Sequence, residues 1–304
     1  MQIEIPIIIT TYKEWIESFL NNNNPGTSYE ICVGLSILRG NHLSKNEVMP
    51  SLYQHVTPCN KFKNIKGIIN LTQKDDVGGT GDIGIVSKDG NIRYYSVTQW
   101  KKKPTKCICN PSGANYGISR TIETEQKNDE AYKLALDFRK NNKGEIPNQK
   151  WKRVSKCPGS KLMAEFLAEE ASNSWMKMSE YKRKEALLKF IDSGKKKNNI
   201  ITTNTDGIIY WDSKKNIIAV IYKWTININI DDHLTTFNDG IYICHGTREN
   251  VILKTQAKYN NGIIEGISSK ILPEKWEPIK SSNYISSWDC VAPDLNKIFK
   301  LEKI

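Results

Sequence analysis

The sequence predicts an α+β protein in which helices flank a central mixed β-sheet, with a β-rich C-terminal part. Two observations lead to this class. Strand-like runs rich in Ile, Val, Tyr and Trp occupy the first and last thirds of the chain, and amphipathic helical patterns fill the middle third. Strands, then helices, then strands again are typical of a sheet covered by helices. We expect a core at residues 1–195 and a β-rich part at residues 196–304, which can also form one continuous domain.

The first two elements are predicted helices. Residues 11–20 form a short amphipathic pattern that a run of Asn residues ends. Residues 27–40 repeat apolar side chains at the i, i+4, i+7 spacing of one helix face before Gly40 ends the segment. Glu30 falls in the first turn of this second helix.

Three strand-like runs come next. Residues 67–73 form the first of them. Residues 82–87 and 92–101 form a predicted hairpin, because the Asp89-Gly90 pair between them favours a tight turn.

The remainder of the chain shows three more helical patterns and then further strands. The helices are expected at residues 128–140, 160–171 and 179–192. The strands are expected at residues 207–212, 216–224, 240–246, 250–259 and 263–268.

The composition suits a protein that binds a polyanion. Lys and Arg number 44 and Asp and Glu 33, which leaves a formal charge of +11. This excess favours nucleic acid over an anionic membrane as partner, although an AT-rich genome would also enrich Lys, Asn and Ile. No apolar run is long enough to span a membrane, and the N-terminal stretch is too short for a secretory signal, so we expect a soluble, cytoplasmic protein. The seven cysteines include no CxxC pair and are expected to be reduced.

Three polar residues mark the open end of the predicted hairpin. Asp82 begins its first strand, and Gln99 and Lys101 end its second. Side chains alternate along a strand, so Gln99 and Lys101 share a face, and the hairpin brings Asp82 to the same end. A carboxylate can hold Mg²⁺ and a lysine can activate water, which together suit phosphodiester hydrolysis. A solvated surface hairpin is the alternative interpretation of the same residues.

This arrangement resembles the PD-(D/E)XK nuclease superfamily, and within it the type II restriction endonucleases. The resemblance implies Mg²⁺ as cofactor and Asp82 as the metal-binding aspartate. It also implies Gln99 as the second metal-site residue, Lys101 as the catalytic lysine and Glu30 as an accessory acid that helps to bind the metal.

The sequence departs from the pattern of that superfamily at two places. Thr80-Gly81 replaces the proline before the aspartate, and Gln99 replaces the usual Asp or Glu. An amide oxygen can bind Mg²⁺ but brings no charge, so a further carboxylate is needed, from the helix at residues 27–40 or else from Asp75 or Asp76.

A second stretch, residues 206–223, also runs from an aspartate through a hairpin to a lysine. The residue two before Lys223 is Ile221, which cannot bind a metal. We interpret this stretch as sheet, with Trp211 and Trp224 packing at its ends.

Two sets of residues are expected to hold and read double-stranded DNA, although either set would also suit a solvated surface. Lysines directly after the hairpin would grip the phosphate backbone, namely Lys102, Lys103 and Lys106. A polar strand face and the turn after it could enter a major groove, through Lys254, Gln256, Lys258, Asn260 and Asn261.

The resemblance implies a Mg²⁺-dependent endonuclease that cuts both DNA strands at a short specific sequence, as a single chain or as a homodimer. The alternatives are a DNA-binding protein without catalysis and a repair or junction nuclease of the same superfamily. The chain has no GxSxG or GxxxxGK[ST] motif, which disfavours serine hydrolases and ATP-driven enzymes. A zinc site would need Cys107, Cys109, His42, His55 and Cys59, whose spacings match no usual zinc pattern.

Overall fold

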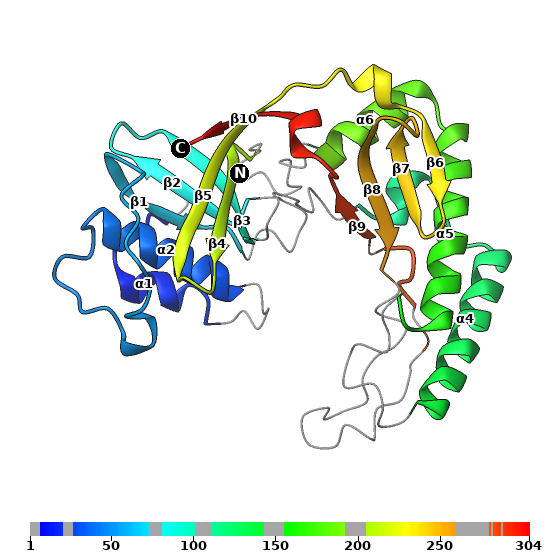
Figure 1. Ribbon diagram of the computed structural model, residues 1–304, viewed down its shortest axis with the longest axis horizontal. Coiled ribbons are helices and arrows are strands. Elements are labelled where there is room, and N and C mark those ends of the chain that lie inside the picture. Colours follow the sequence, from blue (N-terminus) through cyan, green and yellow to red (C-terminus); the bar gives the residue numbers. More distant parts are fainter. Residues whose placement is uncertain are drawn as a thin grey trace, which may run out of the picture. The chain divides into compact units, whose positions relative to one another are not determined.

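The chain forms two compact units, each assembled from separate stretches of the sequence (Figure 1). Unit 1 comprises residues 1–108, 191–228 and 294–304, and unit 2 comprises residues 109–190 and 229–293. The computed structural model describes residues 7–20, 27–72, 81–100, 111–142, 155–191, 205–258, 280, 282–286 and 288–304.

Unit 1 is built on a six-stranded mixed sheet with the strand order β1-β2-β3-β4-β5-β10. Neighbouring strands are antiparallel except β3 and β4, which are parallel. A parallel pair requires a crossover connection, and here the connection contains the helices of unit 2. The strands span β1 Ile65–Asn70, β2 Ile83–Ser87, β3 Ile92–Gln99, β4 Gly207–Asp212, β5 Ile217–Ile226 and β10 Phe299–Lys303.

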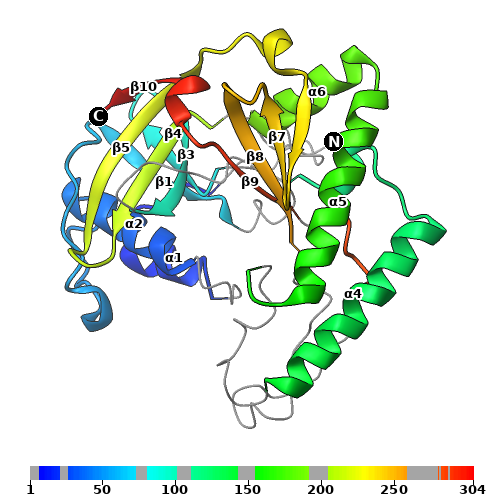
Figure 2. The same ribbon diagram turned by 45° about the vertical axis from the view of Figure 1, so that its right-hand side comes forward.

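Two helices, α1 (Tyr12–Glu17) and α2 (Thr27–Gly40), cover one face of this sheet (Figure 2). α2 packs on β1, β3, β4 and β5, and its buried Leu, Ile and Val side chains join those strands in one hydrophobic cluster. A Cβ at Gly34 would lie 2.1 Å from the Trp15 ring, so only glycine allows α1 to approach α2 this closely. Tight packing against α1 and against the sheet therefore fixes the position of α2.

Unit 2 joins three helices to a four-stranded antiparallel sheet with the order β6-β7-β8-β9. α5 packs on β6, β7 and β8, and α4 packs on α5. A Cβ at Gly159 would lie 2.0 Å from the carbonyl oxygen of Ala131, so α4 and α5 meet in close backbone contact. The elements are α4 Ile122–Asn141, α5 Pro158–Lys177, α6 Glu180–Ile191, β6 Thr236–Asp239, β7 Tyr242–Gly246, β8 Val251–Ala257 and β9 Trp288–Val291.

Short 3-10 helices complete the two units, at Ser51–Tyr53, Gly113–Tyr116, Ile230–His233 and Leu295–Lys297. None of the helices in the described ranges is both long and apolar enough to cross a membrane.

The core of unit 2 encloses a histidine among aromatic rings. His245 has no exposed surface, and its Nε2 lies 3.2 Å from the hydroxyl of Tyr116, which in turn lies 2.5 Å from the Thr255 hydroxyl. The rings of Trp175 and Phe190 also contact the imidazole. Burial lowers the pKa of His245 from 6.5 to about 3, so the imidazole is neutral in the folded protein.

The α+β class predicted from the sequence is confirmed, as is the interpretation of residues 206–223 as a hairpin of the sheet. Trp211 is buried in the α2-side cluster, and Trp224 packs on the opposite face. The boundary expected at residue 195 differs from the observed division, because the middle helices assemble with the second sheet and not with the first. The strand expected at residues 263–268 lies outside the described residues.

Candidate active site

Asp82 lies immediately before β2, at the end of the sheet where β2 begins. Its side chain is buried, and its Oδ2 accepts hydrogen bonds from the Ser96 hydroxyl at 2.8 Å and from the backbone N–H of Val97. Its own backbone N–H donates to the Tyr95 carbonyl at 2.9 Å. If β2 were longer, the N–H of Val97 would bond to a backbone carbonyl of that strand. The carboxylate of Asp82 accepts this hydrogen bond instead, so it lies where the pairing of β2 with β3 ends. Charge-assisted bonds of this kind hold a buried carboxylate in one orientation.

Glu30 approaches the same end of the sheet from the first turn of α2. The hydroxyl of Thr72, two residues beyond the end of β1, donates to Glu30 Oε2 at 2.6 Å. The neighbouring Leu71 donates its backbone N–H to the Asp82 carbonyl at 3.1 Å. Two consecutive residues after β1 therefore link the helix acid to the strand acid. Glu30 and Asp82 belong to one local network.

Gln99 is the last residue of β3 and lies in parallel register with Trp211 of β4. By alternation it shares a face with Val97, which packs into the α2-side cluster. Its amide Nε2 donates to the hydroxyl of Ser213 at 3.1 Å, in the turn that follows β4. The side chain is thus bonded toward β4, whereas Asp82 reaches β3 from the β2 side. Gln99 and Val97 are two residues apart, about 6.6 Å along the strand.

Several residues expected at the site lie outside the described ranges. They are Asp75, Asp76, Lys101, Lys102, Lys103 and Lys106. Within the described ranges, no group of three or more His, Cys, Asp and Glu side chains is placed to hold a metal ion. The zinc site considered from the sequence involves two residues outside these ranges, Cys107 and Cys109.

Ser96 and Thr72 both hold the candidate acids, but neither residue was predicted from the sequence. Ser96 could have been found from the hairpin itself. The turn at residues 88–91 pairs Val86 with Ile92, and counting back along both strands brings position 82 opposite position 96. Thr72 carries no such signal, because its contact with Glu30 depends on how α2 packs on the sheet.

The strand proposed to read bases is β8, and its residues alternate as a half-buried strand should. Lys254, Gln256 and Lys258 are partly exposed, while Thr255 and Ala257 between them are buried. Carboxylates of two other strands of the sheet pair with these lysines. The carboxylate of Asp239 in β6 lies 3.1 Å from Lys254 Nζ, and that of Asp289 in β9 lies 2.5 Å from Lys258 Nζ. The charge of this face is therefore balanced locally. Asn260 and Asn261 lie outside the described residues.

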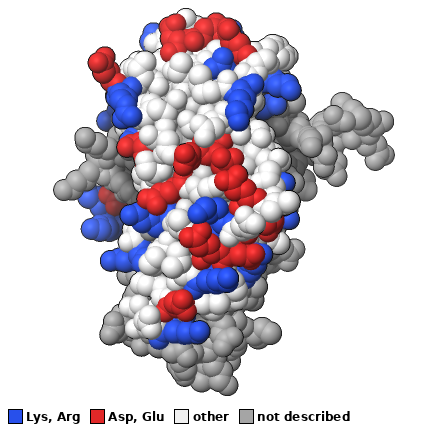
Figure 3. All heavy atoms as spheres, turned by 90° about the vertical axis from the view of Figure 1, so that its right-hand side faces the viewer, with Lys and Arg blue, Asp and Glu red and all other residues white. Residues whose placement is uncertain are grey.

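The helical side of unit 2 carries both signs of charge. Figure 3 shows basic and acidic side chains interspersed there, with the acidic ones gathered across the middle. Several of these side chains form ion pairs within their own helix, such as Lys127 with Glu130 in α4 and Lys161 with Glu165 in α5. The described residues of this side offer no continuous basic surface of the kind that binds nucleic acid.

Comparison of the chain with protein-family models, with curated proteins and with solved structures gives no match. No family is therefore assigned to the chain.

Proposed function

We propose that this protein is a Mg²⁺-dependent endonuclease that cleaves double-stranded DNA at a specific sequence. The observation that carries the proposal is that two acids from distant elements lie at the same end of a mixed sheet. Asp82 lies just before β2 and Glu30 lies in α2; Leu71 bonds to the backbone carbonyl of Asp82, and Thr72 bonds to the side chain of Glu30. Gln99 ends the adjacent strand β3.

The donor set is compatible with Mg²⁺. All candidate ligands offer oxygen atoms, which Mg²⁺ prefers, and this ion is commonly held by one or two carboxylates together with water and substrate phosphates. Two acids therefore suffice, and a group of three acids is not required. When bound, the ion would polarise the phosphodiester and lower the pKa of an attacking water.

The residues of the chain have separate roles in this proposal. Asp82 presents a carboxylate that Ser96 and Val97 hold in a fixed orientation. The hydroxyl of Thr72 holds the carboxylate of Glu30 by one hydrogen bond at the same end of the sheet. The bond of Gln99 to Ser213 restrains its amide, whose carbonyl oxygen can accept a hydrogen bond from water.

Lys101, two residues after Gln99 in the sequence, is proposed to donate hydrogen bonds to the attacking water and to the charge that develops on the phosphate. Lys102, Lys103 and Lys106 would contact the DNA backbone, since ammonium groups attract phosphates regardless of sequence. The formal charge of +11 supports a polyanionic substrate.

The experiment is digestion of a long unmethylated DNA by the purified protein in the presence of Mg²⁺. Discrete bands on a gel are expected, and EDTA should abolish them. Sequencing the ends of the fragments would give the recognition sequence. DNA that stays intact with Mg²⁺, Mn²⁺ and other divalent ions would contradict the proposal.

A second candidate is a sequence-specific DNA-binding protein that does not cleave. The observation in its favour is Gln99, which brings no charge where the resembling nucleases have an acid and is hydrogen-bonded to Ser213. Such a protein would retard DNA on a gel, with steep salt dependence, without ever nicking it.

A further inference from the structure

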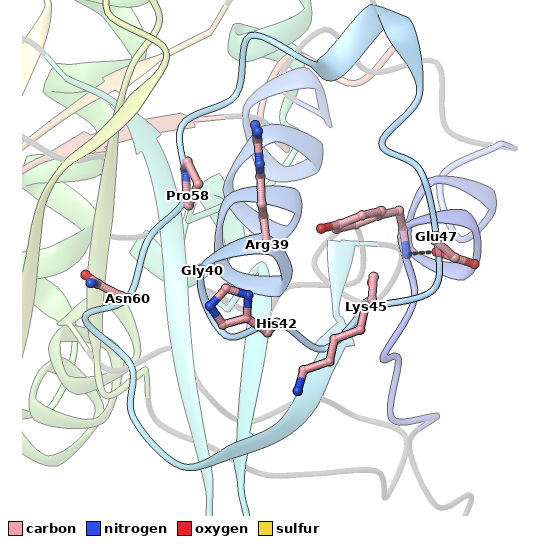
Figure 4. A pocket seen from close by; sticks show the side chains of 9 residues that line it. Arg39, Gly40, His42, Lys45, Glu47, Pro58 and Asn60 are labelled. Atoms are coloured by element: carbon pink, nitrogen blue, oxygen red, sulfur yellow. Dashed lines mark hydrogen bonds between the residues drawn. The ribbon is translucent and has the colours of Figure 1, made fainter.

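Unit 1 contains a polar pocket at the C-terminal end of α2, with a volume of about 470 Å³ (Figure 4). α2 and the segment that follows it form the walls. The side chains of Arg39, His42, Lys45, Glu47 and Asn60 line it. A pocket of this size can admit a nucleotide-sized ligand.

The pocket is positively charged overall. Neither Arg39 nor Lys45 forms an ion pair with any residue in the described ranges. Glu47 is the one acid in the lining, and its Oε2 accepts the backbone N–H of Tyr12 at 2.7 Å, where α1 begins. The C-terminal end of a helix carries negative partial charge and does not attract anions. The attraction for an anion must therefore come from the side chains of Arg39 and Lys45.

Arg39 is fixed in place by the segment that forms the opposite wall. Its Nη1 donates to the carbonyl of Val56 at 2.7 Å and to that of Gln54 at 3.2 Å. The guanidinium has five N–H donors, so it keeps others that can bind a planar or tetrahedral anion.

His42 adopts an unusual backbone conformation to line this pocket. Its φ is +54°, and Leu43 behind it donates its N–H to the carbonyl of Leu38 at 3.1 Å, which closes the end of α2. Glycine is the residue usually found in this left-handed position after a helix, because a side chain there is strained. Histidine tolerates this region better than most residues, and here the conformation brings its imidazole to the pocket.

We propose that this pocket binds a phosphate group, either in a nucleic-acid backbone or in a free nucleotide. Lys45 supplies positive charge beside His42, and Arg39, whose side chain extends away from Lys45 (Figure 4), supplies it on the other side of the pocket. His42 and Asn60 supply hydrogen bonds. The pocket is distinct from the candidate active site, because Arg39 lies nine residues beyond Glu30, about 13 Å along α2. The proposal goes beyond DNA cleavage and does not depend on it.

The test measures binding by the full-length protein in EDTA, so that cleavage plays no part. A fluorescent DNA duplex is titrated with the wild type, with His42→Gly and with Lys45→Ala. Lys88→Ala serves as a matched control, since Lys88 is an exposed lysine of the β2–β3 turn of the same unit. Binding of AMP and of inorganic phosphate is followed through the imidazole NMR signal of His42, assigned by its loss in His42→Gly.

Both pocket variants are expected to bind the phosphate ligand about fivefold more weakly or worse, with Lys45→Ala lowering the salt dependence of DNA binding by about one unit of slope. Lys88→Ala should bind like the wild type. His42→Gly should fold at least as stably as the wild type, which separates lost binding from lost structure.

The outcomes distinguish the two sources of phosphate. Loss of DNA binding in the pocket variants, with no response of His42 to AMP, supports a backbone site. Saturable displacement of the His42 signal by AMP supports a nucleotide site. DNA affinity unchanged in both variants, with no response to AMP or inorganic phosphate, would overturn the proposal. An Asp82→Asn protein should pass the same tests, so failed cleavage and a failed pocket remain distinguishable.

Discussion

Mild acid should destabilise unit 2 through His245. The imidazole is fully buried and neutral, and the rings of Tyr116, Trp175 and Phe190 contact it, with no charged side chain among these three. Burial holds its pKa at about 3 in the folded protein, against 6.5 for an exposed histidine. As the pH falls below 6.5, His245 is therefore protonated in the unfolded chain, whereas in the folded protein it is protonated only near pH 3.

The sign and the size of the effect follow from this difference in proton uptake. Stability contributed by neutral His245 is fully present above pH 6.5 and is lost as the pH falls from there toward 3. Each pH unit within that window costs about 1.4 kcal/mol. Between pH 8 and pH 5 the free energy of unfolding should fall by about 2 kcal/mol from this group alone.

Urea unfolding at pH 8, 6 and 5, followed by tryptophan fluorescence, measures this loss. A His245→Phe variant removes the titrating group and keeps an aromatic ring in the core, so its stability should depend less on pH than that of the wild type. Comparison of the two slopes cancels the carboxylates and His233, which both proteins share. Equal slopes between pH 8 and pH 5 would refute the reasoning.

Three further results are expected. Gly34→Ala should lower the free energy of unfolding by about 1–3 kcal/mol, because the added methyl group meets the Trp15 ring at 2.1 Å; an unchanged urea midpoint would contradict this. His42→Gly should raise the free energy of unfolding by about 0.5–1 kcal/mol, since the relief of strain exceeds the greater entropy of unfolded glycine, and a lower melting temperature would speak against it. If the protein is a nuclease, Thr72→Val should slow cleavage about tenfold by releasing Glu30, while Thr72→Ser should restore it; equal rates for Val and Ser would argue against a positioning role.

Local patterns in the sequence were sufficient to predict the hairpin of β2 and β3. The Asp89-Gly90 turn and the alternation of apolar residues specify both strands, and Gly90 has the positive φ of +88° that such a turn needs. The start of α4 was predicted at residue 128 but lies at Ile122, because Thr121 and Thr124 form a capping box without the usual Glu or Gln.

Pairing between distant segments could not be predicted in this way. Strand β10 at the C-terminus completes the sheet of unit 1 by pairing with β5, and β9 pairs with β8 across a long connection. Both strands alternate apolar and polar residues, but they are only four and five residues long, too short for the alternation to predict a strand or its partner. Long-range packing alone decides where such segments pair.

In the candidate site, too, the local features could be predicted from the sequence and the contacts between distant segments could not. The hairpin predicts that Asp82 and Gln99 lie at one end of two adjacent strands, and the structure describes them there. The bond between Gln99 and Ser213 depends on a parallel pairing of β3 with β4 across more than a hundred residues, which no local pattern specifies. The approach of Glu30 depends in turn on the packing of α2 against the sheet.

The most direct measurement is Mg²⁺-dependent DNA cleavage by Asp82→Asn beside Asp89→Asn. Both changes remove one carboxylate from the same hairpin, but Asp89 is an exposed residue of the turn at its opposite end. The proposed function predicts discrete fragments from the wild type and from Asp89→Asn, and intact DNA with retained DNA binding from Asp82→Asn. Cleavage by Asp82→Asn at the wild-type rate would contradict the assignment of the site.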